Sequence, residues 1–456
     1  MRFRKSLTVL VVVVLLTTSS FKCSESAYAE KELQKLPDNS LTRINDKKGS
    51  RQLLSMATKT FRESAPAAPL VEKYLVEGKL QAGEAALLDE LKRHPHDDQL
   101  RFGLGTLQFL RAIEHLGQQL NQYGVRKSVS TDLNFVPIVR LPVPSNPRPV
   151  VLTYEHARGI ILNFLDDLTK AQGTLAAITD ANVKLPLHFG MIRLDLNGDG
   201  TVSEDESLWK VYAGINGHRN MSAQSAKEFY ISFDRGDVHW LRGYCHLLMS
   251  FCEFYLAHDT RETFNCTAHV FFPKVDSPYA FLNRSKYGRE DREFTEILDL
   301  VALVHTIRWP VVEPARMEAA LHHLEAVVAQ SKESWKWIMS ETDDDREWLP
   351  NPRQTGVIPD VHVTEEMVAA WSNLMDQTGK VLAGERLVPF WRGDDGRGIN
   401  VRKVFTEPRT LDLVLWVQGS AAAPYLETGK KTSVGTWRQL QMAFGDQFPG
   451  FAIWFN

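Results

Sequence analysis

The sequence contains few cysteines, no large excess of charge of either sign and only one long apolar run. Four cysteines among 456 residues are too few for a disulfide scaffold, and 28 glycines are too few for a collagen. A formal net charge of −3 provides no basic surface of the kind that nucleic-acid binding requires. With 43% hydrophobic residues, the chain is also too apolar to be mostly disordered. We therefore expect a globular protein that does not bind nucleic acid.

The common catalytic and phosphate-binding signatures are also absent. The sequence has no H-E-x-x-H, G-x-S-x-G, P-loop or G-x-G-x-x-G pattern. Asp237 and His239 could form the centre of a secreted or periplasmic hydrolase, together with His246, which lies seven residues further along the same predicted helix. The alternative, which we favour, is that Asp237 caps a helix that begins near Val238. The sequence alone indicates no enzyme class.

The one long apolar run lies at the N-terminus and is typical of a signal peptide. Arg2, Arg4 and Lys5 precede the run at 7–16, and a small-x-small cleavage pattern ends at Ala29. The run is shorter than the ~20 residues of a membrane span, which favours a cleaved signal peptide. A retained membrane anchor is the alternative. Cleavage after Ala29 would remove four basic residues and one acidic residue, changing the net charge from −3 to −6. We expect an exported protein, periplasmic or secreted, without a membrane span after cleavage.

The rest of the chain is predicted to be mainly α-helical, with a multi-helix, bundle-like body and few short strands. Residues 30–64 are polar and are expected to form a flexible leader. Five prolines within 135–152 exclude a helix there and mark a linker. This linker separates a helical segment at 65–134 from the main helical domain at 153–456. The two parts could form one large unit or two loosely separated units.

Within the main domain, apolar residues recur at helical spacing in 154–173, 238–258 and 314–340. An alternating run at 229–233 indicates a strand. The cysteines that would remain after signal cleavage are Cys245, Cys252 and Cys266. The first two lie ~10 Å apart on the predicted helix, too far for a disulfide bond. A bond from either to Cys266 stays open, but buried free thiols are favoured.

The segment 66–122 contains a pattern of small and apolar residues around a predicted turn. Gly78, the run 83–88, Pro95 and Leu104-Gly105 follow one another at the spacing of a tetratricopeptide repeat, which this segment resembles. The resemblance implies a pair of helices, and a plain helical hairpin is the alternative. A helical-repeat scaffold that binds a protein partner through helices 66–122 is therefore a further functional hypothesis.

Residues 195–206 carry the one pattern with specific chemistry. They read Asp-Leu-Asn-Gly-Asp-Gly-Thr-Val-Ser-Glu-Asp-Glu. The alternating Asp195, Asn197 and Asp199 offer hard oxygen ligands, and Gly200 follows where a sharp turn needs a residue without a Cβ atom. Glu206 ends the segment with a carboxylate that can bind a cation through both oxygens. This pattern resembles an EF-hand calcium loop.

The resemblance implies a bound Ca²⁺ and an expected set of ligand residues. The implied ligands are Asp195, Asn197, Asp199, Thr201, Ser203 and Glu206. The spacing of Leu187, Met191 and Leu194 predicts a short helix before the loop, and a second short helix is expected after it. EF-hand loops usually pair through the residue at the position of Val202, and the sequence contains no second loop. We therefore expect a calcium-binding protein whose ion is mainly structural. The acidic run 341–345 is a weaker cation candidate.

Overall fold

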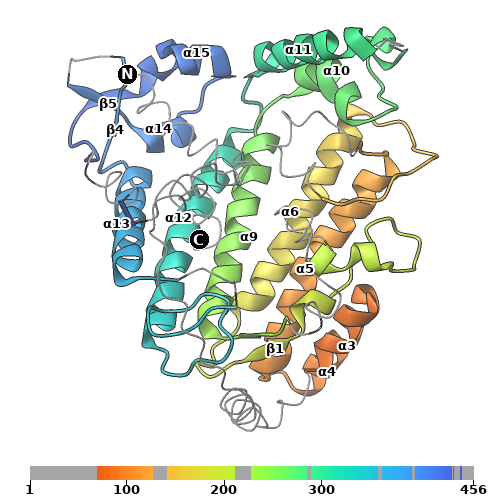
Figure 1. Ribbon diagram of the computed structural model, residues 1–456. Helices are drawn as coiled ribbons and strands as arrows, with labels where there is room; N and C mark the ends of the chain where they lie inside the picture. The colour runs from red at the N-terminus through yellow and green to blue at the C-terminus, as the bar shows by residue number, and fades with distance from the viewer. Residues whose placement is uncertain are drawn as a thin grey trace, which may run out of the picture. The chain divides into compact units, whose positions relative to one another are not determined.

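The computed structural model describes residues 69–126, 141–210, 229–284, 289–357, 362–392 and 396–433, together with Lys227, Gly435 and 442–443 (Figure 1). These residues form a mainly α-helical protein, as the spacing of apolar residues predicts. The predicted signal peptide at 1–29 and the predicted leader at 30–64 lie outside the described residues. None of the described helices combines the length and apolar content that crossing a bilayer requires.

The described helices differ in length from one and a half to more than seven turns. They are α3 (Leu70–Glu77), α4 (Leu80–Arg93), α5 (Asp98–Gln122), α6 (Tyr154–Ala176), α9 (Arg235–Leu256), α10 (Arg261–Phe271), α11 (Arg289–Thr306), α12 (Pro314–Ser340), α13 (Glu365–Leu382), α14 (Val401–Thr406) and α15 (Leu413–Gln418). Single 3-10 turns occur at η3 (Phe189–Met191), η4 (Glu204–Glu206), η5 (Ala280–Arg284) and η6 (Ser420–Tyr425).

The described strands are short and form small antiparallel sheets at the edges of the helical body. One sheet pairs β1 (Leu185–Leu187) with β2 (Ile231–Phe233), and a second pairs β3 (Arg308–Trp309) with β6 (Leu411–Asp412). A third sheet has the order β4 (Val388–Pro389), β5 (Arg397–Ile399), β7 (Leu426–Thr428). Because each strand has only two or three residues, the helices supply most of the core.

Four long helices lie side by side in the order α5, α6, α9, α12, and shorter helices cover the ends of this row (Figure 1). The pair α3 and α4 packs on α5, and α13 packs on α12. Leu116 of α5, Leu168 of α6 and Met249 of α9 belong to one buried apolar cluster. Trp335 of α12 and Trp371 of α13 belong to the next cluster. The body is therefore a row of helices with a continuous core.

The proline-rich connection lies against this core. Val143 and Leu152 from the connection belong to the same apolar cluster as Leu120 of α5 and Leu168 of α6. The Leu152 N–H also donates to the carbonyl of Lys274, at 2.9 Å. The described residues on both sides of the connection belong to one compact unit.

Local signals place the long helices where the sequence predicts them. The predictions for 154–173, 314–340 and 229–233 are confirmed by α6, α12 and β2. The helix predicted at 238–258 is α9, but the predicted cap is wrong. Asp234, not Asp237, caps this helix and accepts from the N–H of Gly236, at 2.8 Å. Asp237 completes a capping box, because its carboxylate accepts the N–H of Asp234 at 3.0 Å.

The three described cysteines are free thiols. Cys245 and Cys252 are buried on α9, and Cys266 is half-buried on α10. Burial raises the pKa of Cys245 and the pKa of Cys252 to about 12, which keeps both in the thiol form at neutral pH. This confirms the favoured prediction of buried thiols.

Candidate functional site

The segment 195–206 forms a tight loop between two paired main-chain stretches. The Leu194 N–H donates to the carbonyl of Glu206 at 3.1 Å, and the Leu208 N–H donates to that of Ile192 at 2.8 Å. The helix predicted before the loop is therefore wrong, because β1, η3 and an extended stretch occupy this place. Ile192, Leu194 and Leu196 are all buried, which is the period of two that an extended chain produces. After the loop, a helical turn begins at Leu208, and residues 211–226 lie outside the described part.

The first half of the loop is folded around the Asp195 carboxylate. This carboxylate accepts the N–H of Gly198 at 2.8 Å and the N–H of Gly200 at 3.0 Å. Asn197 and Asp199 each accept the N–H two residues further on, both at 2.8 Å. The two glycines have φ values of 73° and 79°, which only glycine adopts at low energy. The two glycines therefore permit the turn that gathers these three oxygen-bearing side chains.

The second half of the loop is closed by Glu206. One oxygen of this carboxylate accepts the Leu196 N–H at 3.1 Å, and the other accepts the N–H and the hydroxyl of Ser203, each at 2.9 Å. The Glu206 side chain is buried, with a relative exposure of 2%. Among the described residues, no Lys or Arg forms an ion pair with Asp195, Asp199 or Glu206. The three carboxylates do not all lie within 4.8 Å of one another in this structure.

A buried glutamate on α5, Glu114, adds a fourth acidic group beside the loop. Its Oε2 accepts the Asp195 N–H at 2.9 Å. The pKa of Glu114 is raised to about 7, chiefly by burial and also by the carboxylates of Asp195 and Glu206, while that hydrogen bond and Arg111 lower it. The sequence interpretation missed this residue. Its one local signal is an acidic side chain within the apolar helix at 104–120.

A second group of acidic residues lies where α9 begins and α12 ends. Carboxylate oxygens of Asp234, Glu341 and Glu347 lie within 4.8 Å of one another, close enough to hold a cation. Burial, together with their mutual proximity, raises the pKa of Glu341 to about 10 and the pKa of Glu347 to about 7. The neighbouring carboxyl of Asp237 is completely enclosed and its pKa is raised well above the ordinary value. Glu341 is therefore protonated near neutral pH, and Glu347 is partly protonated there.

The acidic run 341–345 thus contributes only its first residue to this group. Asp343 pairs instead with Lys184, and the Asp344 carboxylate accepts the Thr355 N–H at 2.7 Å. The group is assembled from two helix ends and a following loop, with more than 100 residues between Asp234 and Glu341. We refer to Asp234, Asp237, Glu341 and Glu347 as the carboxyl cluster.

Asp237 and His239 do not form an open catalytic site. Their relative exposures are 5% and 6%, and they have separate partners. The Asp237 carboxylate accepts the N–H of Asp234, whereas His239 Nδ1 lies 2.8 Å from Oε1 of Gln330 on α12. Burial lowers the pKa of His239, so that its imidazole is neutral at pH 7. This burial weighs against the hydrolase hypothesis at these residues.

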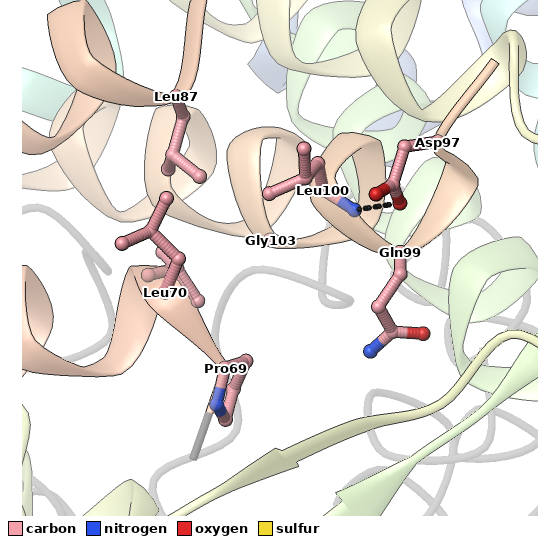
Figure 2. Close-up of a pocket in the computed structure, with 8 residues that line it drawn as sticks. Pro69, Leu70, Leu87, Asp97, Gln99, Leu100 and Gly103 are labelled. Carbon is pink, nitrogen blue, oxygen red and sulfur yellow. Dashed lines mark hydrogen bonds between the residues drawn. The ribbon is translucent and has the colours of Figure 1, made fainter. Parts of the chain in front are cut away.

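The described helices within 66–122 expose few large apolar side chains. Leu70 and Leu88 are the exposed large apolar side chains of this segment within the described part. Figure 2 shows a small cavity of about 90 Å³ between the first turns of α3 and α5, where Asp97 accepts the Leu100 N–H at 2.9 Å. A typical small-molecule site encloses several hundred Å³. The cavity therefore has room for one small side chain rather than for an extended peptide.

The same helices include the predicted turn, because α3 ends at Gly78 and α4 begins at Leu80. Helix α5 continues through Leu104-Gly105 to Gln122 and has 25 residues. The described segment therefore contains three helices, and the resemblance to a tetratricopeptide repeat stays a prediction.

Comparison of the chain with protein-family models, with curated proteins and with solved structures gave no match. The functional argument therefore rests on the residues and their geometry. Of the polar groups described above, the loop at 195–206 is the one that combines carboxylate, amide, hydroxyl and main-chain oxygens in a single turn. This mixture is the chemistry that calcium prefers in proteins.

Proposed function

We propose that this protein binds one Ca²⁺ in the loop at 195–206 and that the ion is mainly structural. The observation that carries the proposal is the loop itself, in which Asp195 accepts main-chain N–H groups from both Gly198 and Gly200. These contacts, with those accepted by Asn197 and Asp199, fold the first half of the loop around three of the six predicted ligand residues. Export through the signal-like N-terminus is part of the same proposal and would place the protein where calcium is plentiful.

Electrostatics explain why the loop would favour a bound cation. Asp195, Asp199 and Glu206 lie within one turn, and Glu206 is buried. Three neighbouring carboxylates repel one another when they are ionised, and the repulsion is strongest where water is excluded. A divalent cation would replace this repulsion with attraction. The ion would then stabilise the folded state over the unfolded state, because only the folded loop gathers these oxygens.

The position of the loop favours a structural role for the ion. Leu194 and Leu196 are buried in the same apolar cluster as Leu75 of α3 and Leu175 of α6. An ion that fixes the loop therefore fixes residues of the core. At a calcium concentration about 100-fold above the dissociation constant, binding would stabilise the fold by about 2.7 kcal/mol.

Calorimetric titration of the EDTA-treated protein with CaCl₂ tests the proposal. We expect one calcium per chain, and we expect Asp195→Ala and Glu206→Gln to weaken binding by at least about 100-fold. Asp205→Asn is the matched control, because the Asp205 side chain is 91% exposed and stands at a loop position that does not ligate. Absence of calcium binding by the wild-type protein, or equal affinity in all variants, would contradict the proposal.

A further inference from the structure

The loop at 195–206 lies against the three consecutive helices α3, α4 and α5, which we call the hairpin α3–α5. One contact is with α3. The carbonyl of Leu75 in the last turn of α3 accepts the Arg193 N–H at 3.0 Å. Gly78, which ends this helix with φ of 65°, lies against Val202 of the loop. A Cβ atom added at Gly78 would lie 2.5 Å from Cγ1 of Val202, so a larger residue would push the loop away. Val202 thus packs against the end of α3. In EF-hand proteins, the residue at this position of the loop usually contacts a second loop.

Helix α5 makes the second contact and holds the main chain of Asp195 on both sides. Oε2 of Glu114 accepts the Asp195 N–H at 2.9 Å, and Nε2 of Gln118 donates to the Asp195 carbonyl at 2.8 Å. Glu114 and Gln118 are four residues apart, so they share one face of the helix. Between them, Gly117 allows the chain to approach closely, since a Cβ atom there would lie 2.6 Å from Cδ2 of Leu196.

We propose that the hairpin α3–α5 takes the place of the second EF-hand, with Glu114 and Gln118 as positioning residues for the calcium site. This inference rests on the proposed calcium binding. Glu114 and Gln118 fix the main chain of Asp195 and thereby set the direction of its carboxylate before the ion arrives. A ligand that is already oriented loses less conformational freedom on binding, so its affinity is higher. Calcium binding and the packing of the hairpin on the loop are therefore coupled, and each strengthens the other.

The calcium dissociation constants of variants at these two positions test the inference. Gln118→Leu and Glu114→Leu each remove one hydrogen bond to Asp195, and we expect each to weaken calcium binding about 10-fold. Glu114→Gln keeps an oxygen that can accept the Asp195 N–H, so we expect it to restore an affinity within about 3-fold of the wild type. Gln122→Leu is the matched control, because Gln122 lies one turn beyond Gln118 on α5 and is exposed.

The melting temperature of the calcium-free variants separates positioning from general stability. A residue that only supports the fold would lower this temperature and leave the calcium dissociation constant unchanged. If a Leu variant does not fold, hydrogen exchange of the wild-type protein gives a second measurement. We expect calcium to slow exchange in the last turn of α3 and around 114–118 of α5, as well as in the loop. Slowing confined to 195–206 would overturn the coupling.

The failure of this inference differs from the failure of the proposed function. If the wild type binds calcium and Glu206→Gln does not, but Gln118→Leu and Glu114→Leu bind with unchanged affinity, then the positioning role is wrong and calcium binding stands. If the wild type shows no calcium binding by calorimetry, both proposals are wrong.

Discussion

Glu341 and Glu347 illustrate what burial does to single acidic side chains in this protein. Their carboxyl groups lie beside those of Asp234 and Asp237, and the nearby cation Lys184 pairs with Asp343 outside the carboxyl cluster. Desolvation disfavours every ionised form, and each ionised neighbour raises the pKa of the others. Folding at neutral pH therefore requires these groups either to take up protons or to remain ionised at a cost in free energy.

Replacing one carboxyl of the cluster by an amide should stabilise the protein. Gln at position 341 keeps the shape of the side chain, can still accept from Gln354, and can donate to Asp234 without a titrating proton. We expect Glu341→Gln to increase the free energy of unfolding at pH 7 by about 1–3 kcal/mol, measured by urea denaturation. Glu318→Gln, at an exposed position on the same helix, should change it by less than about 0.5 kcal/mol. Destabilisation by Glu341→Gln would instead indicate that the cluster binds a cation.

The same groups predict the direction of the pH dependence. The folded-state pKa is about 7 for Glu347 and about 10 for Glu341, against an ordinary value of 4.5, so the folded state binds more protons than the unfolded state. Their contribution to stability is complete below pH 4.5 and is lost as the pH rises, through about 7 for Glu347 and through about 10 for Glu341. We expect the unfolding free energy at fixed calcium to fall between pH 5 and 7.5. The slope should be smaller in Glu347→Gln, and an equal slope would contradict the assignment.

At the scale of elements, the contact between α9 and α12 has a regular series of polar pairs. His239 lies 2.8 Å from Gln330, His246 lies 3.0 Å from His323, and Arg316 donates to Glu253 at 2.7 Å. Successive pairs are seven residues apart on both helices, and the two helices run in opposite directions. One polar pair therefore occurs every two turns along a mostly apolar contact. Such pairs specify the register of packed helices, because a shifted register would leave each polar side chain without its partner.

The histidine pair of this series provides a test of that role. Burial and the neighbouring His323 lower the pKa of His246 to about 4, so both rings are neutral at pH 7 and share one hydrogen bond. We expect His323→Leu to reduce the unfolding free energy by about 1–3 kcal/mol, because Nδ1 of His246 loses its partner while Nε2 keeps Gln172 at 3.1 Å. Adding His246→Leu should recover most of this loss. A denaturant-based double-mutant cycle measures the coupling, and additive effects would contradict the pairing.

For the whole molecule, the connected core predicts a single unfolding event. One apolar cluster joins α3, α5 and β1 to α9, and the next joins α5, α6 and α9 to the connection at 141–152. We expect calorimetry to show one main transition that moves as a whole when calcium is removed. With a stabilisation of about 2.7 kcal/mol, EDTA should lower the melting temperature by roughly 3 °C, because a chain of this length has a large unfolding entropy.

Two loosely connected units would behave differently from one connected core. They would give two transitions, of which only the one containing residues 195–206 would respond to EDTA. The control is Asp195→Ala, in which the transition should not respond to calcium at all.

Much of the helical framework follows from local patterns in the sequence. The apolar stripe of α12 predicts its bounds and its packing face, since seven positions at helical spacing are buried or half-buried there. The pattern of the loop at 195–206 is equally local, because its predicted ligand residues lie within 12 positions and its glycines permit the turn. These features depend on neighbours a few residues away, and periodicity and turn chemistry report such neighbours.

Other features depend on residues that only the folded chain brings together. Glu114 meets Asp195 across 81 residues of sequence, and Asp234 meets Glu341 across more than 100. The approach to the loop is extended rather than helical because Leu194 pairs with Glu206 and packs into a core built from distant helices. The sequence by itself gives the chemistry of each side chain and the local pattern of helices and turns. The tertiary structure decides which carboxyl groups are buried, and this burial raises their pKa values. It also decides which helices contact the loop.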